Sequence, residues 1–313
     1  MADQEAFAQA RAALRRGSKS FHGAARLFDP ATRRSVVLLY AWCRHCDDVI
    51  DEQHLGFAAP AAPAPDIATR LAGLRANTIL ACTPGARPAE PVFAGLAEVV
   101  ARHHLPTRYP LAHLDGFAMD AAGRRYRTEA DILDYCWHVA GVIGVMMALI
   151  MGARDDETLD RASDLGIAFQ LTNIARDVID DARAGRVYLP TDWLDAEGID
   201  PATIALLADR AGLAAVTARL IDLAEPYYAS AAIGLRALPA RSAWSIATAL
   251  RVYRAIGRKV RARGAGAWDR RVVTSKPEKL CHLLAASLPA TMAATRGPGQ
   301  RRPPRDALWT RPA

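Results

Sequence analysis

Two groups of acidic and amide residues have the composition and spacing best suited to chemistry in this chain. Asp47 and Asp51 in the first group, and Asn173, Asp177 and Asp181 in the second, follow each other at intervals of four residues, which places them on one face of a helix. Like charges at this spacing repel each other, and a divalent cation with oxygen ligands commonly offsets that repulsion. The two motifs therefore predict a cavity in which metal ions hold a phosphorylated substrate. The first acidic motif is Asp47, Asp48 and Asp51, and the second acidic motif is Asn173, Asp177 and Asp181.

The alternative for each motif is a solvated helix face, which is the more usual role of aspartates four residues apart. The flanking sequence argues against this alternative. An apolar stretch, residues 35–43, precedes the first motif, and a second apolar stretch, residues 165–172, precedes the second. We therefore expect both motifs to point into a cleft.

Cations and aromatic residues accompany the two motifs. Tyr40 and Arg44 share the helical stripe of the first motif, and Arg176 and Arg186 lie beside the second. Arg44 could form a surface ion pair with Asp48 or could bind a diphosphate with its planar guanidinium group. No Ser/His/Asp or Cys/His arrangement is evident, which disfavours covalent acyl chemistry.

The expected chemistry is the departure of a diphosphate, assisted by the metal ions. The carbocation left behind needs a dry, apolar pocket lined by aromatic rings. Ordinary core packing is the alternative role for each aromatic residue. The candidates for lining this pocket are Phe21, Tyr40, Tyr135, Trp137 and Phe169.

The elements that must position these residues are predicted to be helices. Alanine is abundant in the 313-residue chain, alternating β-branched runs are scarce, and no strand, Gly-rich loop and helix unit is evident. We expect an all-α bundle around a central cavity, formed by one domain over residues 1–296. The Pro/Arg-rich tail, residues 297–313, is expected to be disordered. Helices are expected at residues 1–16, 30–54, 66–82, 91–104, 107–120, 128–152, 155–182, 201–212, 213–235, 240–263 and 276–288.

Charge and cysteine content limit the class of protein further. The net charge of +7 suits anionic substrates, anionic lipid or nucleic acid. Nucleic acid is not expected as a partner, because the acidic residues cluster on the cavity helices. The five cysteines show no disulfide framework, which indicates a reducing cytosol. Cys43 and Cys46 have C-x-x-C spacing but lack the second pair of a zinc site and the βαβ context of a redox site.

The most apolar stretch, residues 139–151, is shorter than the ~20 residues that span a bilayer. We therefore expect it to be a buried helix. Gly141 and Gly144 lie within it, and glycine costs a helix about 1 kcal/mol relative to alanine. Close helix packing or a cavity wall would explain both glycines, and a long apolar ligand would use such a surface.

Seven segments of the chain resemble the bacterial phytoene synthases of the squalene/phytoene synthase family. The resemblance covers roughly residues 15–285. The segments are GSKSF (17–21), LYAWCRHCDDVID (39–51), LDGFAMD (114–120), RRYRT (124–128), YCWHVAGVIGVMMALIMG (135–152), AFQLTNIARDVIDDARAGRVYLP (168–190) and AWDRRVVTSKPEKL (267–280).

The resemblance implies an isoprenoid-synthase-type fold and the head-to-head condensation of two geranylgeranyl diphosphates through prephytoene diphosphate to phytoene. It implies two to three Mg²⁺ or Mn²⁺ ions held through the diphosphates, and no NADPH. Peripheral contact with the inner face of the cell membrane is expected from the apolar product, and other carotenoid-pathway enzymes are candidate partners. The alternatives are squalene or dehydrosqualene synthesis from farnesyl diphosphate and a non-catalytic member of the fold.

Individual site residues follow from the same resemblance. Both acidic motifs correspond to the metal–diphosphate motifs of the family, and Asp47, Asp48, Asp51, Asp177 and Asp181 are the expected catalytic carboxylates. The match at Arg271 is ambiguous by one position, because Arg270 directly precedes it. The remaining matches are Ser18, Ser20, Tyr40 and Arg44 on the diphosphate side, Tyr135, Gln170 and Arg176 near the reacting carbons, and Tyr253 and Arg271 as later contacts.

Overall fold

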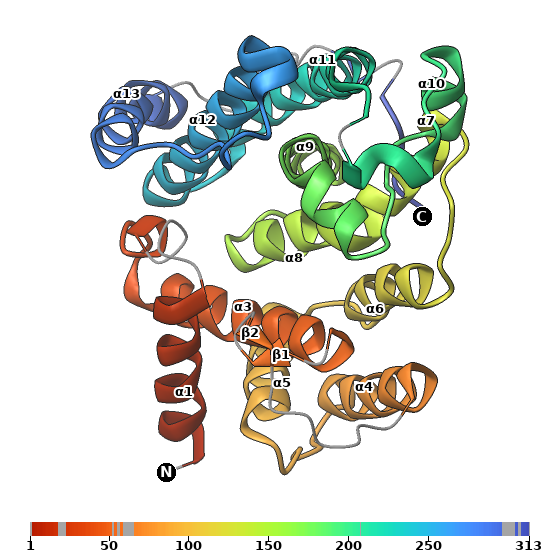
Figure 1. The fold of residues 1–313 in the computed structure, drawn as a ribbon. Coiled ribbons are helices and arrows are strands. Elements are labelled where there is room, and N and C mark those ends of the chain that lie inside the picture. Colours follow the sequence, from red (N-terminus) through yellow and green to blue (C-terminus); the bar gives the residue numbers. More distant parts are fainter. Residues whose placement is uncertain are drawn as a thin grey trace.

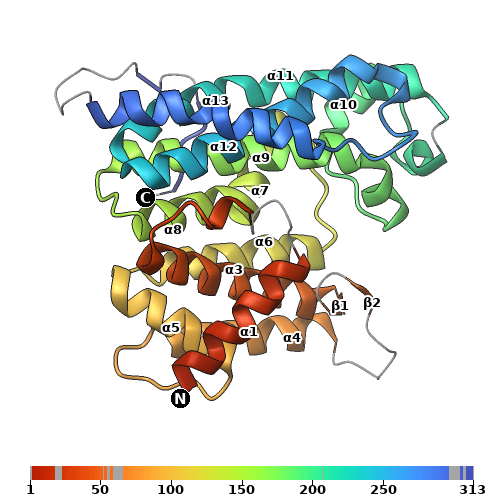
Figure 2. The same ribbon diagram turned by 90° about the vertical axis from the view of Figure 1, so that its left-hand side faces the viewer.

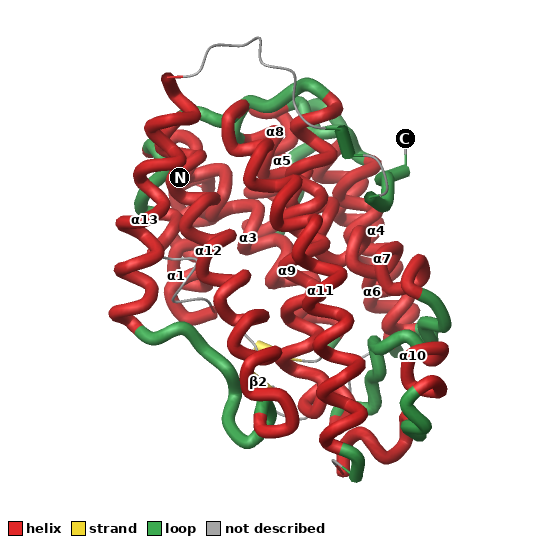
Figure 3. Tube along the Cα trace, turned by 90° about the horizontal axis from the view of Figure 1, so that it is seen from above, coloured by secondary structure: helices red, strands yellow, loops and turns green. Residues whose placement is uncertain are grey.

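The computed structural model describes residues 2–17, 23–51, 53–54, 57–58, 66–206, 208–295, 304–305 and 308–312. Nearly all of this part of the chain is helical (Figures 1 and 3). Ser18, Ser20 and Phe21 lie outside it. The α-helices are α1 (Ala2–Gly17), α3 (Pro30–Ile50), α4 (Ile67–Cys82), α5 (Pro91–His103), α6 (Arg108–Ala121), α7 (Glu129–Cys136), α8 (Val142–Ile150), α9 (Asp156–Arg183), α10 (Thr191–Ala196), α11 (Arg210–Gly234), α12 (Ala240–Arg263) and α13 (Lys276–Thr295).

The helices form two groups that face each other across the middle of the molecule. Helices α1 and α3 to α6 form one group, and α9 with α11, α12 and α13 forms the other (Figure 2). Helices α7 and α8, joined by the π-helical turn η1 (Trp137–Gly141), run between them. This arrangement leaves α9 in contact with α8, η1, α11 and α12, so α9 is the central helix of the bundle.

Helix α3 carries the first acidic motif. Asp29 caps its N-terminus by accepting hydrogen bonds from the backbone N–H groups of Ala31 and Thr32, and Pro30 occupies the first turn, where a missing N–H costs nothing. The helix ends at Ile50, so the predicted end at residue 54 is wrong. Two-residue strands follow instead, and β1 (Gln53–His54) pairs antiparallel with β2 (Phe57–Ala58).

Helices α7 and α8 confirm the expected buried helix. The stretch Glu129–Ile150 is long and apolar enough to cross a membrane, but 61% of its apolar window is buried inside the bundle. A Cβ atom at Gly144 would lie 2.2 Å from the backbone oxygen of Ala162 on α9, and one at Gly166 would lie 2.2 Å from that of Ala140. Both glycines are therefore required by the close approach of two helices.

The C-terminal half departs from the sequence prediction at three points. The helices expected at 201–212 and 213–235 are a 3₁₀ helix, η2 (Pro201–Leu206), and one long helix, α11. Asp209 caps α11 by accepting from the backbone N–H of Gly212. The short helix α10 was not predicted, because six residues are too few to show a period. Helix α13 extends to Thr295, beyond the predicted end at residue 288.

The tail also departs from the prediction in the part that the structure describes. Residues 304–305 and 308–312 lie against α9 and α11, whereas the composition predicts disorder throughout residues 297–313. Arg305 and Arg311 form ion pairs with aspartates of α9. These pairs supply the attraction that composition alone cannot reveal.

Candidate active site

A cavity of about 860 Å³ runs through the middle of the bundle. It is lined by α3, α6, η1, α8, α9, α11, α12 and α13 together with residues 23–27. On α9 the lining extends from Asn173 to Thr158, a distance of about 22 Å at 1.5 Å per residue. Asp47, Arg44 and Asn173 make one end polar, and the walls between the ends are mostly apolar.

The first acidic motif lies at the polar end and is partly neutralised by arginines. Arg44 contacts Asp47 at 2.8 Å and Asp48 at 2.7 Å, and Arg186 contacts Asp51 at 2.6 Å. Burial raises the pKa of Asp47 to about 6, and repulsion from Asp51 adds to this rise. The ion pair between Arg44 and Asp48, one of the two alternatives for Arg44, is present, while Arg44 also lines the cavity.

The second acidic motif faces the first from α9. Arg176 donates to Asp177 at 2.8 Å, and Arg271 contacts the same carboxylate at 2.8 Å. Burial raises the pKa of Asp181 to about 7, with repulsion from Asp177 as the second cause. Asn173 Oδ1 is buried and has no hydrogen-bond partner among the described residues.

Arg186 connects the two motifs. It follows α9 in the chain and binds Asp51 at the end of α3. Its positive charge also lowers the pKa of both Asp47 and Asp181 against the effect of burial. Asp47 of the first motif and Asn173 of the second, which are far apart in the sequence, therefore line the same cavity, while the other members of the two motifs lie outside its lining.

Metal ions fit this end only together with other oxygen ligands. Within the described residues no group of three or more His, Cys, Asp or Glu side chains could hold a metal ion by itself. The unpartnered Asn173 Oδ1 and the raised pKa values of Asp47 and Asp181 mark oxygens that are not fully satisfied by the protein. Mg²⁺ keeps several non-protein oxygens in its shell, so the arrangement suits ions shared with a bound diphosphate.

The other predicted site residues divide into two sets. Tyr40, Phe169, Gln170 and Tyr253 line the cavity, and the rings of Phe169 and Tyr253 stack with centroids 4.2 Å apart. Tyr135 and Trp137 are buried but lie outside the cavity lining. Cys43 and Cys46 are free thiols whose pKa is raised by burial, and Cys43 also lines the cavity.

Several residues near the cavity were not singled out from the sequence. Asp120 on α6 accepts hydrogen bonds from the hydroxyls of Tyr135 and Tyr188, each at 3.1 Å, and burial raises its pKa. The segment LDGFAMD contains Asp120 and was the available signal for it. Lys279 and Leu280 of α13 also line the cavity, and nothing in their local pattern indicates this.

Comparison with known proteins identifies the family that this chain matches. A family model described as squalene/phytoene synthase matches residues 14–278. The chain is 57% identical to the phytoene synthase of Pseudescherichia vulneris, over 95% of this chain and 94% of that protein. It is 54% identical to the 15-cis-phytoene synthase of Pantoea ananas, over 95% of this chain and 94% of that protein.

Solved structures confirm the fold class. A dehydrosqualene synthase in complex with ligand superimposes with a TM-score of 0.82 and 26% identity, over 93% of this chain and 98% of that chain. A squalene synthase from Alicyclobacillus acidocaldarius superimposes with a TM-score of 0.74 over 84% of this chain and 95% of that chain. The expected isoprenoid-synthase-type helical fold is therefore confirmed.

Proposed function

The chain belongs to the squalene/phytoene synthase family, and we propose that it is a transferase that condenses two geranylgeranyl diphosphates to phytoene. The observation that carries this proposal is the meeting of two acidic motifs at the polar end of a long apolar cavity. The relatives at 54% and 57% identity are named phytoene synthases, whereas the solved dehydrosqualene synthase is only 26% identical. The identities therefore favour phytoene over dehydrosqualene as the product.

The polar end binds and orients the two diphosphates. Arg44 and Arg271 present guanidinium groups there, and a guanidinium can bind two oxygens of one phosphate in parallel. Mg²⁺ or Mn²⁺, when bound, would neutralise the diphosphate charge and so make it a better leaving group. The residues that would hold two to three such ions through the diphosphates are Asp47, Asp48, Asp51, Asn173, Asp177 and Asp181.

The apolar walls govern what happens after the diphosphate leaves. In the first step, the allylic C–O bond breaks, the double bond of the second substrate attacks the cation, and loss of one proton gives prephytoene diphosphate. In the second step, the remaining diphosphate leaves, the cyclopropane rearranges, and loss of a second proton gives phytoene. Two diphosphates and two protons depart, so the reaction balances without NADPH. Phe169, Tyr253 and their neighbours exclude water, which would otherwise trap the cations.

The proposal is tested by incubating the purified chain with Mg²⁺ and with geranylgeranyl or farnesyl diphosphate separately. We expect a forty-carbon hydrocarbon from the longer substrate without a reductant. A thirty-carbon product from farnesyl diphosphate alone would move the enzyme to the squalene or dehydrosqualene branch.

The role of the motifs is tested with Asp48→Asn and Asp177→Asn. Each variant should fold normally and lose turnover, and EDTA should stop the wild-type reaction until Mg²⁺ or Mn²⁺ is added. The matched control is Asp180→Asn. Asp180 lies on α9 with Asp177 but is exposed, and its ion-pair partner Arg183 is 3.8 Å away. Normal turnover by either motif variant, or activity that survives EDTA, would remove the metal–diphosphate model.

Helix α13 is the proposed contact with a membrane, for an enzyme that we place in the cytoplasm on the inner face of the cell membrane. Leu280 lines the cavity and is 56% exposed, so it borders an opening, and Leu284, one turn further on, is 61% exposed. Lys276 and Lys279 lie on the same helix. Exposed leucines beside lysines suit an anionic bilayer, which would receive the apolar product.

Vesicle sedimentation tests this contact. The wild-type chain should bind phosphatidylglycerol vesicles, and Leu284→Ser should weaken that binding while turnover in detergent is unchanged. The control is Leu206→Ser, because Leu206 is 77% exposed but lies on η2 outside the cavity lining. Equal losses in both variants would refute the assignment of α13.

A further inference from the structure

Helix α9 carries a third acidic stripe, made of Asp156, Asp160 and Asp164 at intervals of four residues. Asp164 lies nine residues before Asn173, about two and a half turns at 3.6 residues per turn, so this stripe and the second acidic motif face opposite sides of the helix. Asp164 has no exposed surface. A buried carboxylate needs a cation and hydrogen bonds to remain charged.

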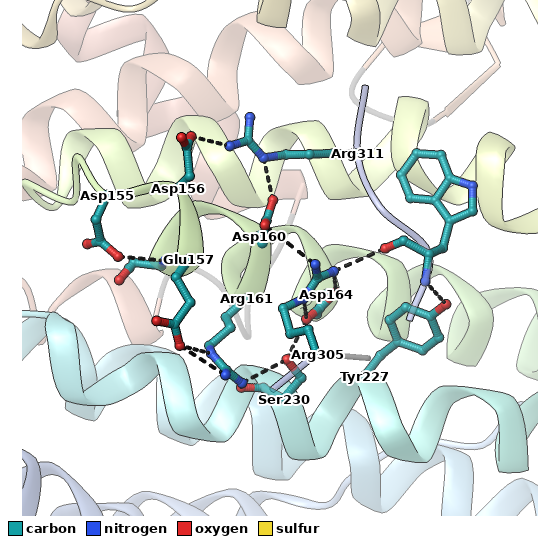
Figure 4. Close-up of polar contacts among 12 residues, drawn as sticks. Asp155, Asp156, Glu157, Asp160, Arg161, Asp164, Tyr227, Ser230, Arg305 and Arg311 are labelled. Carbon is teal, nitrogen blue, oxygen red and sulfur yellow. Dashed lines mark hydrogen bonds and ion pairs between the residues drawn. The ribbon is translucent and has the colours of Figure 1, made fainter. Parts of the chain in front are cut away.

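The C-terminal tail supplies the cations for this stripe (Figure 4). Arg305 donates two hydrogen bonds to Asp164, at 2.6 and 2.8 Å, and lies 3.5 Å from Asp160. Arg311 contacts Asp160 and Asp156, each at 2.6 Å. The side chains of Arg311 and Asp160 are only 8% and 21% exposed, so their pair is not a surface ion pair of negligible effect, whereas Asp156 is 88% exposed and adds less.

The tail also contacts three other elements. The backbone N–H of Trp309 donates to the hydroxyl of Tyr227 on α11, and Arg311 donates to the hydroxyl of Tyr109 on α6, each at 3.1 Å. The ring of Trp309 lies 5.9 Å from that of Trp137 in η1. We call Arg305, Trp309 and Arg311 the C-terminal clasp, because together they hold α6, η1, α9 and α11.

The clasp reaches the cavity through a continuous chain of contacts. Asp164 accepts a hydrogen bond from the hydroxyl of Ser230 at 2.5 Å, and Arg161 donates to the same hydroxyl at 3.2 Å (Figure 4). Arg161 is 2% exposed and lines the cavity near Thr158, at the end remote from the acidic motifs. A second route runs from Trp309 through Trp137 to η1, whose next residues line the cavity wall.

We propose that the C-terminal clasp fixes the remote end of the cavity and thereby determines the length of prenyl chain that the enzyme accepts. The proposal rests on the proposed function above and names what sets substrate length at that site. Arg305, Trp309 and Arg311 are positioning residues, since they act through Arg161 and η1. A geranylgeranyl chain extends further toward that end than a farnesyl chain, so it is the more sensitive to displacement of Arg161.

The test compares kcat/KM for geranylgeranyl and farnesyl diphosphate in Arg305→Gln and Trp309→Ala. All reactions are run well below the melting temperature of each variant. We expect kcat/KM for the longer substrate to fall about tenfold, the range in which pocket shape discriminates neighbouring substrates, while the value for the shorter one changes little. The control is Arg210→Gln, which removes an exposed 2.7 Å ion pair with Asp269.

A double variant separates positioning from simple loss of stability. Arg305→Gln alone leaves Asp164 buried without its cation, whereas Arg305→Gln with Asp164→Asn removes both charges. The double variant should regain melting temperature but not the preference for the longer substrate. Residue 164 is still no longer held by Arg305, so Ser230 and, through it, Arg161 are not fixed in place. If Arg305→Gln fails to fold, Arg305→Lys and Arg311→Gln are compared in the same way.

The outcomes are decisive in both directions. The proposal is supported if the ratio of kcat/KM for geranylgeranyl diphosphate to kcat/KM for farnesyl diphosphate falls in the clasp variants and is unchanged in the control. Equal loss with both substrates, or an unchanged ratio, overturns it. Failure of the proposed function is seen separately, as a wild-type chain that makes no forty-carbon product at all.

Discussion

Replacing Asp181 by asparagine should remove activity while making the metal-free protein more stable above neutral pH. In the folded state burial and the neighbouring Asp177 raise the pKa of Asp181 from 3.8 to about 7. The folded protein therefore holds a proton that the unfolded chain has already lost between these two pKa values. Its stability falls as the pH rises through this window, and the deficit is complete at about pH 8.

The size of the effect follows from the shift. Each pKa unit corresponds to about 1.4 kcal/mol, so the full shift corresponds to roughly 4 kcal/mol, and water at the partly exposed polar end screens about half of this. Asparagine keeps the shape of the side chain but cannot ionise. We expect Asp181→Asn to be more stable than the wild type by about 2 kcal/mol at pH 8 and equally stable at about pH 4.

Urea unfolding followed by circular dichroism, in EDTA and without substrate, measures this difference. The same samples with Mg²⁺ and substrate should show no turnover by the variant. Asp180→Asn is the control, because Asp180 is exposed and is only a lesser cause of the raised pKa of Asp181, so its replacement should change stability by less than about 0.5 kcal/mol at either pH. A variant that is less stable than the wild type at pH 8, or whose advantage does not depend on pH, would refute the reasoning.

Two further substitutions have matched controls in the chain. Gly144→Ala should destabilise the protein by about 1–3 kcal/mol, because its new methyl group would meet the α9 backbone at 2.2 Å, whereas Gly73→Ala has no atom within 4 Å and should be neutral or slightly stabilising in thermal unfolding. Arg271→Gln should raise KM about tenfold, the equivalent of ~1.4 kcal/mol, because Arg271 contacts Asp177 at 2.8 Å. Arg270→Gln should leave KM unchanged. If KM rises in Arg270→Gln and not in Arg271→Gln, the substrate contact belongs to Arg270 instead of Arg271.

The sequence predicts the helices well where the signal is local. Asp29 and Pro30 mark the start of α3, and the predicted span of α12, 240–263, agrees with the structure. Both acidic motifs were also visible, because helical spacing alone brings their members to one face. Helix ends were less predictable, as at Ile50, since the chain after it pairs with a later segment instead of continuing the helix.

Long-range partners account for what the sequence could not predict. Asp120 is one acidic residue among many until the fold brings it to Tyr135 and Tyr188. The clasp is the strongest case, because Arg305 finds its partner Asp164 across 141 positions of the chain. Composition shows only that the tail is rich in proline and arginine. The tail binds to aspartates of α9, and nothing in the sequence around those aspartates indicates a partner so far along the chain.

The two faces of α9 show what distinguishes a structural acidic stripe from a candidate site. Both stripes repeat oxygen ligands every four residues, so their spacing carries the same information. On the face turned away from the cavity, Arg305 and Arg311 of the protein's own tail bind Asp156, Asp160 and Asp164. On the cavity face Arg176 and Arg271 bind Asp177, but Asn173 Oδ1 has no partner and Asp181 has no ion pair among the described residues. An oxygen that the fold leaves unsatisfied beside an 860 Å³ cavity needs a partner from outside the chain, and that need distinguishes the cavity face as the candidate site of chemistry.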